Sequence, residues 1–457
     1  MIEKTTQRRD STQTLGRGGE KLAIVWVYPE VDGRVTPLAS GRTVVGRDFT
    51  CDVRLAGDQT SRQHAEIVKE SAMVVIADLN SMNGTYVDGR RITRAPIDEG
   101  SVIRIGDWVG VVLRLVGEPD GAVFQEIIPG YFGGPRTLAA VEPLRKAATS
   151  DLAVIIEGET GTGKEGIARA THLWSGRKGP FIAVNCAALP ENLAEGELFG
   201  YRKGAFTSAE RASPGYFQAA NGGTLFLDEV SDLSEAIQPK LLRALEQGEV
   251  TPLGETRPIP VDVRVVVATQ KPLTTLVDED RFRADLMARL DGLRIKLLPL
   301  RARVEEVPNL FARLLKAKSG TAPAVDAAAV ESLCCHRWPL NIREVTNLAK
   351  RVAALHGQEK MLKRSHLASL LDQRMPASKT DKASKADPRP VEDEPSSADE
   401  EDWTAVEREE RKLILEVLDR CAGNQTAAAK KLDMSRSTLI VKLKRYGIRR
   451  PQADREE

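Results

Sequence analysis

The sequence has few of the features that mark an oxidising compartment or a membrane. Its 457 residues include 5 cysteines, which show neither metal-ligand spacing nor an even number for a disulfide framework. No apolar run approaches the ~20 residues that a membrane-spanning helix needs, and the N-terminus is polar and charged. We therefore expect a cytoplasmic protein with reduced thiols and no membrane contact.

An excess of either charge is also missing. Lys plus Arg number 66 and Asp plus Glu 65, so the formal net charge is +1. No field of the whole protein draws it onto nucleic acid, and any affinity for DNA must come from a local patch. The length suits about three domains, because domains commonly contain ~100–200 residues.

Composition divides the chain into three candidate domains, which makes it a multidomain protein. Short β-rich runs alternate with turn residues in the first block, which predicts an all-β sandwich. Strands alternate with helices in the second block, which predicts an α/β domain followed by a helical piece. The third block is small and all-α, and the segment before it lacks the aliphatic residues of a core. The predicted boundaries are 1–20 (flexible tail), 21–117 (sandwich), 118–131 (linker), 132–300 (α/β), 301–373 (helical), 374–402 (disordered linker) and 403–452 (all-α).

A phosphate-binding loop begins the α/β block. The apolar segment 152–157 runs into GETGTGKE and then into a helical pattern, which is the context that a P-loop requires. Glycines let backbone N–H groups point at phosphates, and Lys164 supplies charge to the β and γ oxygens. Glu165 stands where a Ser or Thr commonly binds Mg²⁺. The predicted ATP contacts in this loop are Gly158, Glu159, Thr160, Gly161, Thr162, Gly163, Lys164 and Glu165.

A second apolar segment, 222–229, ends in two carboxylates. Asp228 is expected to hold Mg²⁺ and Glu229 to polarise the attacking water, because phosphoryl transfer needs mainly positioning and charge neutralisation. The alternative is a buried strand whose terminal acids are only solvated. With the phosphate loop upstream, these residues predict an ATPase with ATP and Mg²⁺ as cofactors.

Five segments of this block resemble the AAA+ domain of bacterial sigma-54-dependent transcriptional activators. They are GETGTGKE (158–165), NCAAL (185–189), GAFTSA (204–209), FRADLMARL (282–290) and WPLNIRE (338–344). In that family these are the Walker A loop, the switch segment, the loop that engages sigma-54, the arginine-finger segment and the sensor II segment. The resemblance implies an α/β AAA+ ATPase with a helical lid that acts on sigma-54 RNA polymerase holoenzyme as a hexameric ring.

The resemblance also implies roles for single residues. Asn185 would restrain Glu229 until the ring is engaged, Thr269 would lie in the sensor I segment, and Arg343 would sense the γ-phosphate. Arg283 and Arg289 would reach the ATP of a neighbouring subunit, although either alone would more often be a surface ion-pair partner. The implied sigma-54 contacts are Gly204, Ala205, Phe206, Thr207, Ser208 and Ala209.

The sequence departs from the family at three positions. Ser208 replaces the glycine of GAFTGA and loses some backbone freedom, Gln270 replaces an asparagine, and Leu340 replaces a glycine. A second hypothesis therefore stays open, in which the protein is a DNA-binding regulator whose ATP site controls assembly only. A phosphopeptide-binding scaffold is a third hypothesis.

The last block has the pattern of a helix-turn-helix. A break at residues 433–434 separates two helical segments, and residues 430–450 include eight Lys or Arg and one acid. The block resembles a Fis-type domain, which implies a dimer on upstream promoter DNA; a three-helix protein-binding module is the alternative. The predicted DNA contacts are Arg436, Ser437, Thr438, Lys442 and Lys444.

The first block resembles a forkhead-associated (FHA) domain, which binds phosphothreonine. Its phosphopeptide contacts would be Arg47, Ser61, Arg62 and Asn83, whose side chains offer donors to a phosphate or peptide. His64 is expected to be a buried brace. The implied partner is a phosphothreonine-containing protein or a Ser/Thr kinase, and Thr12 and Thr14 in the basic tail form a candidate kinase site. A solvated tail is the simpler interpretation.

Overall fold

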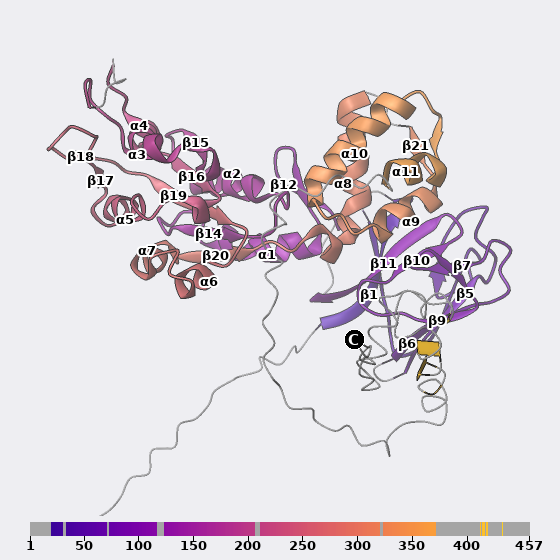
Figure 1. The fold of residues 1–457 in the computed structure, drawn as a ribbon. Coiled ribbons are helices and arrows are strands. Elements are labelled where there is room, and N and C mark those ends of the chain that lie inside the picture. The colour runs from indigo at the N-terminus through magenta and orange to yellow at the C-terminus, as the bar shows by residue number, and fades with distance from the viewer. Residues whose placement is uncertain are drawn as a thin grey trace, which may run out of the picture. The chain divides into compact units, whose positions relative to one another are not determined.

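The computed structural model describes residues 20–30, 33–70, 73–116, 123–205, 211–319 and 323–371, together with 412, 414, 415, 417, 418 and 432. The chain divides into two units, Met1–Met375 and Pro376–Glu457. Among the described residues, no helix has the length and apolar character needed to cross a membrane. The first unit holds an all-β domain, an α/β domain and a helical lid (Figure 1), as the sequence predicts.

The all-β domain is a sandwich of two sheets, with strand orders β2-β1-β11-β10-β7-β8 and β4-β3-β5-β6-β9. Alternate residues of its strands are buried, as in β5, and the core contains Trp26 and Trp108 packed edge to face at 6.0 Å. The strands are β1 (Glu20–Tyr28), β2 (Arg34–Pro37), β3 (Gly41–Gly46), β4 (Val53–Arg54), β5 (Ala65–Glu70), β6 (Met73–Asp78), β7 (Thr85–Val87), β8 (Arg90–Ile92), β9 (Arg94–Pro96), β10 (Val102–Ile105) and β11 (Trp108–Val116).

The segment expected to be a plain linker contains structure. Strands β12 (Gln125–Ile128) and β13 (Tyr131–Gly133) pair antiparallel. Val123 and Phe124, just before β12, are buried in an apolar cluster with β1 and β11. Apolar side chains in a short connection gain free energy by burial, so this segment is anchored to the sandwich.

The α/β domain is built on five parallel strands in the order β15-β16-β19-β14-β20. Ile155 of β14 packs into one apolar cluster, whereas Val154 and Ile156 pack into another, so both faces of the sheet are covered. The elements of this domain are β14 (Val154–Glu157), β15 (Phe181–Asn185), β16 (Thr224–Asp228), β17 (Glu249–Val250), β18 (Ile259–Pro260), β19 (Arg264–Thr269), β20 (Leu293–Lys296), α1 (Pro135–Lys146), α2 (Lys164–Ser175), η1 (Cys186–Ala188), α3 (Glu191–Phe199), α4 (Gly215–Ala219), η2 (Val230–Asp232), α5 (Gln238–Gln247), α6 (Leu273–Asp278) and α7 (Ala284–Leu290).

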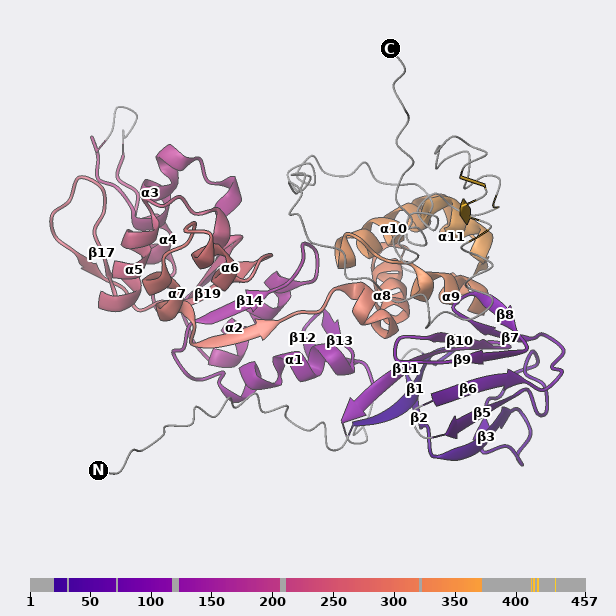
Figure 2. The ribbon, with the colours of Figure 1, turned by 60° about the horizontal axis from the view of Figure 1, so that its bottom comes forward.

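The lid follows β20 and packs around a fully buried Trp338, whose Nε1 donates to the Leu333 carbonyl at 2.9 Å. Its helix α9 contacts β10 and β11 of the sandwich, as both views show (Figures 1 and 2). The elements of the lid are η3 (Leu300–Ala302), η4 (Val304–Glu306), α8 (Val307–Ser319), β21 (Ala324–Val325), α9 (Ala327–Cys335), α10 (Asn341–His356), β22 (Met361–Leu362) and α11 (Arg364–Leu371).

Candidate active site

The phosphate loop leaves β14 and enters α2. The N–H of Gly158 donates to the Thr269 carbonyl at 3.1 Å, which ties the loop to β19. Gly161 and Gly163 have φ values of 77° and 101°, a region that side chains disfavour. A side chain at Gly161 would also collide with the Leu340 carbonyl of the lid. These two positions need glycine for the shape of the loop and for the approach of the lid.

Lys164 lies buried at the end of the loop and faces an acidic edge. Its Nζ donates to the Gly158 carbonyl at 3.0 Å and lies 3.4 Å from Glu229 Oε1. Glu229 Oε1 also accepts from Gln270 Nε2 at 3.0 Å. The lysine, the carboxylate and the amide therefore meet where the carboxyl ends of β14, β16 and β19 lie side by side, as is usual for ligand sites of parallel sheets.

Asp228 ends β16 and is suited to a divalent cation. Its Oδ1 accepts from the Glu229 N–H at 3.1 Å. Burial raises the pKa of Asp228, Lys164 lowers it and Glu229 raises it further. Among the described residues no group of three or more His, Cys, Asp or Glu forms a metal site. A carboxylate beside a phosphate-binding lysine fits a Mg²⁺ whose other ligands come from ATP.

Asn185 lies opposite Asp228 in the pairing of β15 with β16. Its Oδ1 accepts from the Ala187 N–H at 3.0 Å and so caps the short helix η1. The Glu229 carboxylate accepts hydrogen bonds from Lys164 and Gln270, not from Asn185. The contact between Gln270 and Glu229 was not predicted from the sequence. The signal that could have indicated it is the position of Gln270 directly after Thr269, in the segment that resembles sensor I.

The two acidic residues of the phosphate loop have arginine partners. Glu159 accepts from Arg301 at 2.7 and 2.6 Å, and this hydrogen bonding lowers the pKa of Glu159. Glu165 accepts from Arg169 at 2.8 Å on the exposed face of α2. The contact of Arg301 with Glu159 was not predicted, because Arg301 lies far from the loop in the sequence and belongs to no recognised motif.

The lid places Arg343 beside the loop. A Cβ at Gly161 would lie 3.1 Å from the Arg343 Cβ, and the Ile342 N–H donates to the Gly161 carbonyl at 2.8 Å. Helix α10 begins at Asn341, so the WPLNIRE segment forms the turn and first helical residues against the loop. The geometry suits a sensor on the γ-phosphate side.

Of the two arginine-finger candidates, Arg283 is the N-cap of α7 and Arg289 lies in its last turn. Arg283 precedes the helix and pairs with Asp285 at 2.6 Å, and Arg289 donates to the Leu245 carbonyl at 3.1 and 2.9 Å. These contacts within one chain are with α5 and α7, not with the chain's own phosphate loop. A role across subunits stays a prediction.

The segments that contain Ser213 and Leu253 support the GAFTSA loop at its base. Tyr201 is bridged to Ser213 on the returning strand and to Leu253, and the Arg202 N–H donates to the Leu253 carbonyl at 3.1 Å. Gly204 and Ala205 lie in a turn, in which the Ala205 N–H donates to the Arg202 carbonyl at 3.2 Å. The predicted contacts Phe206, Thr207, Ser208 and Ala209 lie outside the described residues.

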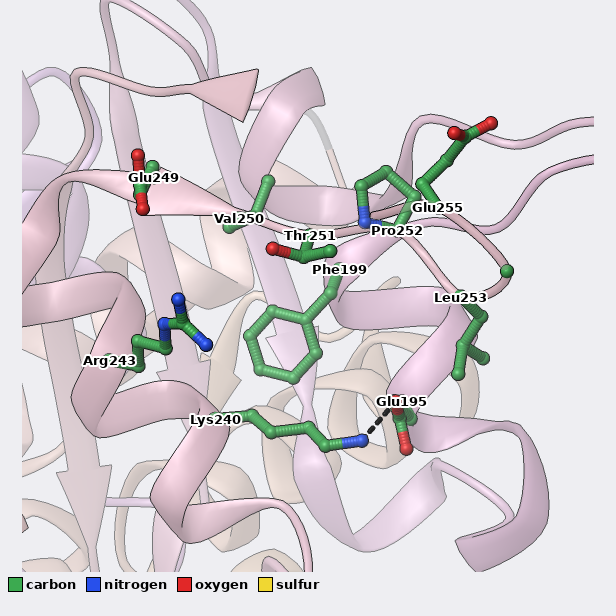
Figure 3. A pocket seen from close by; sticks show the side chains of 11 residues that line it. Glu195, Phe199, Lys240, Arg243, Glu249, Val250, Thr251, Pro252, Leu253 and Glu255 are labelled. Atoms are coloured by element: carbon green, nitrogen blue, oxygen red, sulfur yellow. Dashed lines mark ion pairs between the residues drawn. The ribbon is translucent and has the colours of Figure 1, made fainter. Parts of the chain in front are cut away.

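A pocket of about 270 Å³ lies at the base of this loop (Figure 3). It is enclosed by α3, which leads into the loop, by α5, and by residues 249–255. Phe199 forms an apolar side of the pocket, and an ion pair between Lys240 and Glu195 joins α5 to α3 across it. Through this pair, a helix that follows β16 contacts the helix that carries the loop.

The loops at one end of the sandwich bring the predicted phosphopeptide residues together. The Arg47 N–H donates to the Ser61 carbonyl at 3.0 Å, Ser61 Oγ accepts from the Met82 N–H at 3.1 Å, and the neighbouring Arg62 is exposed. Asn83 Nδ2 donates to the Gln59 carbonyl at 2.8 Å and so ties the second loop to the first. The surface presents an exposed arginine on each of two adjoining loops.

His64 is the buried brace that the sequence predicts. It has no exposed surface, and its Nδ1 accepts from the Ser61 N–H at 3.0 Å while Nε2 lies 3.2 Å from the Gly84 carbonyl. Burial lowers the pKa of His64, so the neutral ring is favoured, with its proton on Nε2. Through its two ring nitrogens His64 joins the loop of Ser61 to the loop of Gly84.

The predicted DNA contacts cannot be placed in the fold. Arg436, Ser437, Thr438, Lys442 and Lys444 lie outside the described residues, as do Thr12 and Thr14. Of the last block, Ile414 and Leu418 are described and are buried.

Four family models match the chain in the order of its blocks. They are the FHA domain at residues 43–106, the Sigma-54 interaction domain at 133–296, the AAA+ ATPase lid domain at 301–384 and the Fis family of bacterial regulatory proteins at 405–446. The DNA-binding transcriptional regulator NtrC of Azospirillum brasilense is 39% identical over 351 residues, which are 72% of each chain.

This chain belongs to the family of sigma-54-dependent transcriptional activators. The activator is also 43% identical to NtrC of Bradyrhizobium sp. over 264 residues, a match that covers 55% of each chain. A crystal structure of NtrX from Brucella abortus in complex with ATP is similar at 30% identity over 68% of each chain, with a TM-score of 0.46.

Membership of this family establishes the chemistry of the central domain. The AAA+ domains of sigma-54 activators are ATPases, and this activator has the Sigma-54 interaction domain, its lid, an FHA domain and a Fis-type helix-turn-helix. The predicted fold class and family are thereby confirmed, and the activator binds ATP.

Proposed function

We propose that this activator binds upstream promoter DNA, assembles into a ring and uses ATP hydrolysis to remodel sigma-54 RNA polymerase holoenzyme into an open complex. The observation that supports this most directly is the connection at Figure 3: α3, which leads into the GAFTSA loop, is joined by the Glu195–Lys240 pair to α5, which follows the acidic end of β16. A movement at the end of β16 on ATP hydrolysis could therefore be transmitted through α5 and the ion pair to α3 and the GAFTSA loop. A DNA-binding protein of this kind acts in the bacterial cytoplasm.

In the proposed mechanism Lys164 binds the β and γ phosphates, and Asp228 would hold a Mg²⁺ ion, which would offset phosphate charge. When ATP binds, Lys164 turns from the Glu229 carboxylate to the phosphates. Glu229 is then free to orient the attacking water. Arg283 and Arg289 of one subunit complete the site of its neighbour, which makes hydrolysis depend on assembly. Arg343 reports the γ-phosphate to the lid.

Phosphothreonine is the proposed input. Arg47 and Arg62 would bind the phosphate, with Ser61 as a further donor and Asn83 on the peptide backbone. The source would be a phosphorylated partner protein, a Ser/Thr kinase or the activator's own tail. DNA is proposed to bind as two half-sites through a dimer of the last block, with Arg436 to Thr438 at the start of the recognition helix.

The deciding experiment is ATP-dependent open-complex formation by sigma-54 holoenzyme with this protein added. Opening that is lost in Lys164→Ala, while DNA binding of that variant is intact, supports the proposal. If the wild-type protein hydrolyses ATP and opens nothing, Ser208→Gly is the second test. Rescue by Ser208→Gly locates the defect in the loop. Continued failure with intact ATP turnover favours the other candidate, a DNA-binding regulator whose ATP site controls assembly only, for which Ser208 and Gln270 are the main support.

A further inference from the structure

The outer side of the phosphate loop is bound by groups that lie outside the loop. Four consecutive backbone carbonyls of the loop each accept a hydrogen bond from outside the loop, three from the lid and its entry segment and one from β13. These bonds are Asn341 Nδ2 to Thr160 O (3.0 Å), Ile342 N to Gly161 O (2.8 Å), Arg303 Nη2 to Thr162 O (2.7 Å) and Tyr131 Oη to Gly163 O (3.3 Å). The Gly163 carbonyl also accepts from the N–H groups of Gly166 (3.0 Å) and Ile167 (3.4 Å) in α2.

The direction of these carbonyls fixes the direction of the phosphate donors. In a planar trans peptide the C=O of one residue and the N–H of the next point in opposite directions. Carbonyls of residues 160–163 that are held outward therefore turn the N–H groups of residues 161, 163 and 164 toward the other side, where a P-loop binds phosphate. The Thr162 N–H donates within the loop, to the Glu159 carbonyl at 3.3 Å. The four bonds orient the donors before nucleotide arrives.

Arg303 is the most constrained of the four donors. Its residue is 1% exposed, and the guanidinium also donates to the Leu298 carbonyl (3.0 Å), Thr137 Oγ1 (3.0 Å) and Glu306 Oε2 (2.6 Å). Glu306 is fixed in turn by the Gly134 N–H at 2.9 Å. A guanidinium with four N–H groups in use has one orientation, which a lysine cannot reproduce.

Arg303 also lies at the joint between the ATPase domain and the lid. It follows η3 and directly precedes η4, on the segment that leads from β20 into α8. Any rotation of the lid about this joint moves the guanidinium relative to Thr162 and moves the N-terminus of α10 relative to Gly161. The position of the lid is therefore communicated to the loop through three of the four carbonyls, those of Thr160, Gly161 and Thr162.

We propose that Arg303 and Tyr131 are positioning residues for ATP, which set nucleotide affinity by holding the outer carbonyls of the phosphate loop. Neither residue touches the phosphates in this role. The effect is on binding more than on the chemical step, because Lys164, Asp228 and Glu229 keep their places. The inference depends on ATP binding by this chain and not on the remodelling of sigma-54, so failure of open-complex formation leaves it unaffected.

The test compares nucleotide affinity in variants of the full chain. Arg303→Met combined with Glu306→Gln removes the bond to Thr162 without leaving a buried charge unpaired. The expected result is a rise of about tenfold in KM for ATP and in the Kd for ADP, with kcat within about twofold of wild type, since one lost hydrogen bond to a charged group has roughly that effect. A Lys at position 303 is expected not to restore the affinity.

Arg264→Met provides the matched control. Arg264 is equally buried (1% exposed) and donates to the carbonyls of Ala148 and Leu152, at the opposite end of the sheet from the loop. Its truncation is expected to lower the thermal midpoint and to leave KM for ATP unchanged. A rise in KM as large as that of the Arg303 variant would mean that any loss of stability weakens binding, and would overturn the proposal.

Tyr131→Phe tests the same idea without disturbing the core. The substitution keeps the ring that packs against Gly163 and Gly166 and removes only the hydroxyl. The expected result is a rise of about threefold in KM for ATP and in the Kd for ADP, at an unchanged thermal midpoint. If the Arg303 variant does not fold, this variant decides: wild-type affinity in Tyr131→Phe overturns the proposal.

Discussion

Gln270 holds the carboxylate that is expected to activate water. Its Nε2 lies 3.0 Å from Glu229 Oε1, whose other partner is Lys164. When Lys164 binds the phosphates of ATP, Gln270 is the partner that still holds the Glu229 carboxylate. A residue in this position affects the orientation of Glu229 more than the binding of ATP.

Gln270→Asn is therefore expected to lower kcat. Asparagine is one methylene shorter, by about 1.5 Å, so its amide cannot reach Glu229 without movement of the backbone. We expect kcat for ATP hydrolysis to fall by about three- to tenfold and KM to stay within about twofold, because the lost bond orients Glu229 and leaves the phosphate loop intact. Gln247→Asn, which shortens an exposed glutamine on α5, is the control and should leave both constants unchanged. A higher kcat in Gln270→Asn would mean that Gln270 restrains Glu229 instead of aligning it.

Glu305 is a fully buried acid at the joint between the sandwich, the lid and the ATPase domain. Burial, together with the neighbouring Glu306, raises the pKa of Glu305 from 4.5 to about 8, although Arg136 opposes the shift. The carboxyl group is therefore neutral in the folded protein at pH 7. Because the folded protein binds this proton more tightly than the unfolded chain does, the contribution of Glu305 to the free energy of unfolding is complete below pH 4.5. It is lost as the pH rises toward about 8.

Glu305→Gln should remove this dependence on pH, because glutamine keeps the shape and stays neutral. The free energy of unfolding of wild type relative to the variant is expected to fall by about 1.4 kcal/mol per pH unit within that window. Thermal midpoints of both proteins at pH 5 and pH 8 give the comparison, and the variant should gain on wild type at the higher pH. Glu142→Gln, on an exposed side chain of α1, should show no such gain. Parallel pH profiles of wild type and Glu305→Gln would disprove the raised pKa.

At the scale of elements, the sequence predicts what is encoded locally. The run from 152 to 165 gives strand, glycine loop and helix, and β14 and α2 form there because buried β-branched residues and a glycine-ended turn favour them. The contacts of Arg303 and Tyr131 with the loop were not predicted. They join residues far apart in sequence, and neither has a period or a motif that would single it out.

The segment around β12 shows the same limit. Residues 118–131 contain two glycines and two prolines, which favour a linker, yet Val123 and Phe124 are buried against the sandwich. Whether two apolar residues in a connection are buried depends on a surface that only the tertiary structure supplies. Asn185 is a different case, because its Oδ1 accepts from the Ala187 N–H two residues on, which is a local capping bond.

The pair between α3 and α5 leads to a prediction about coupling. Lys240→Met removes the ion pair with Glu195 across the pocket of Figure 3, and the lining of this pocket contains neither the phosphate loop nor Asp228 and Glu229. We expect ATP turnover within about twofold of wild type and a reduction of about fivefold or more in open-complex formation. The pair is partly exposed and contributes little to stability, so unfolding should not explain the loss.

The charge-swapped protein, Lys240→Glu with Glu195→Lys, is the control for this pair. It restores an ion pair across the pocket with the charges exchanged, so opening should recover in part. If the single variant opens promoters as wild type does, the α3–α5 contact does not transmit the state of the nucleotide. If the swap is as defective as the single variant, the individual side chains matter and not the pair.

At the scale of the whole first unit, the sandwich and the lid share one apolar cluster. It joins strands β1, β10 and β11 to Val304 of η4 and to Val330 and Cys334 of α9. Arg104 crosses this contact: its Nε lies 2.9 Å from Glu331 Oε2, and its guanidinium lies 3.6 Å above the Tyr86 ring. Val304 is the neighbour of Arg303, so the face that packs on the FHA sheet is adjacent to the residue that holds the phosphate loop.

Arg104→Met is expected to weaken this contact and, through it, the binding of ATP. The substitution leaves Glu331, whose side chain is 1% exposed, as a buried charge without a cation, which typically costs about 3–5 kcal/mol. Amide exchange in α9 should accelerate by a factor on the order of 100, and KM for ATP should rise about threefold as Val304 loses its packing. Arg42→Met breaks an exposed pair with Glu66 on the same domain and should change neither quantity. Adding Glu331→Met to Arg104→Met replaces both charges with apolar groups and should restore both quantities, whereas a rise in KM without faster exchange in α9 would separate the FHA contact from nucleotide affinity.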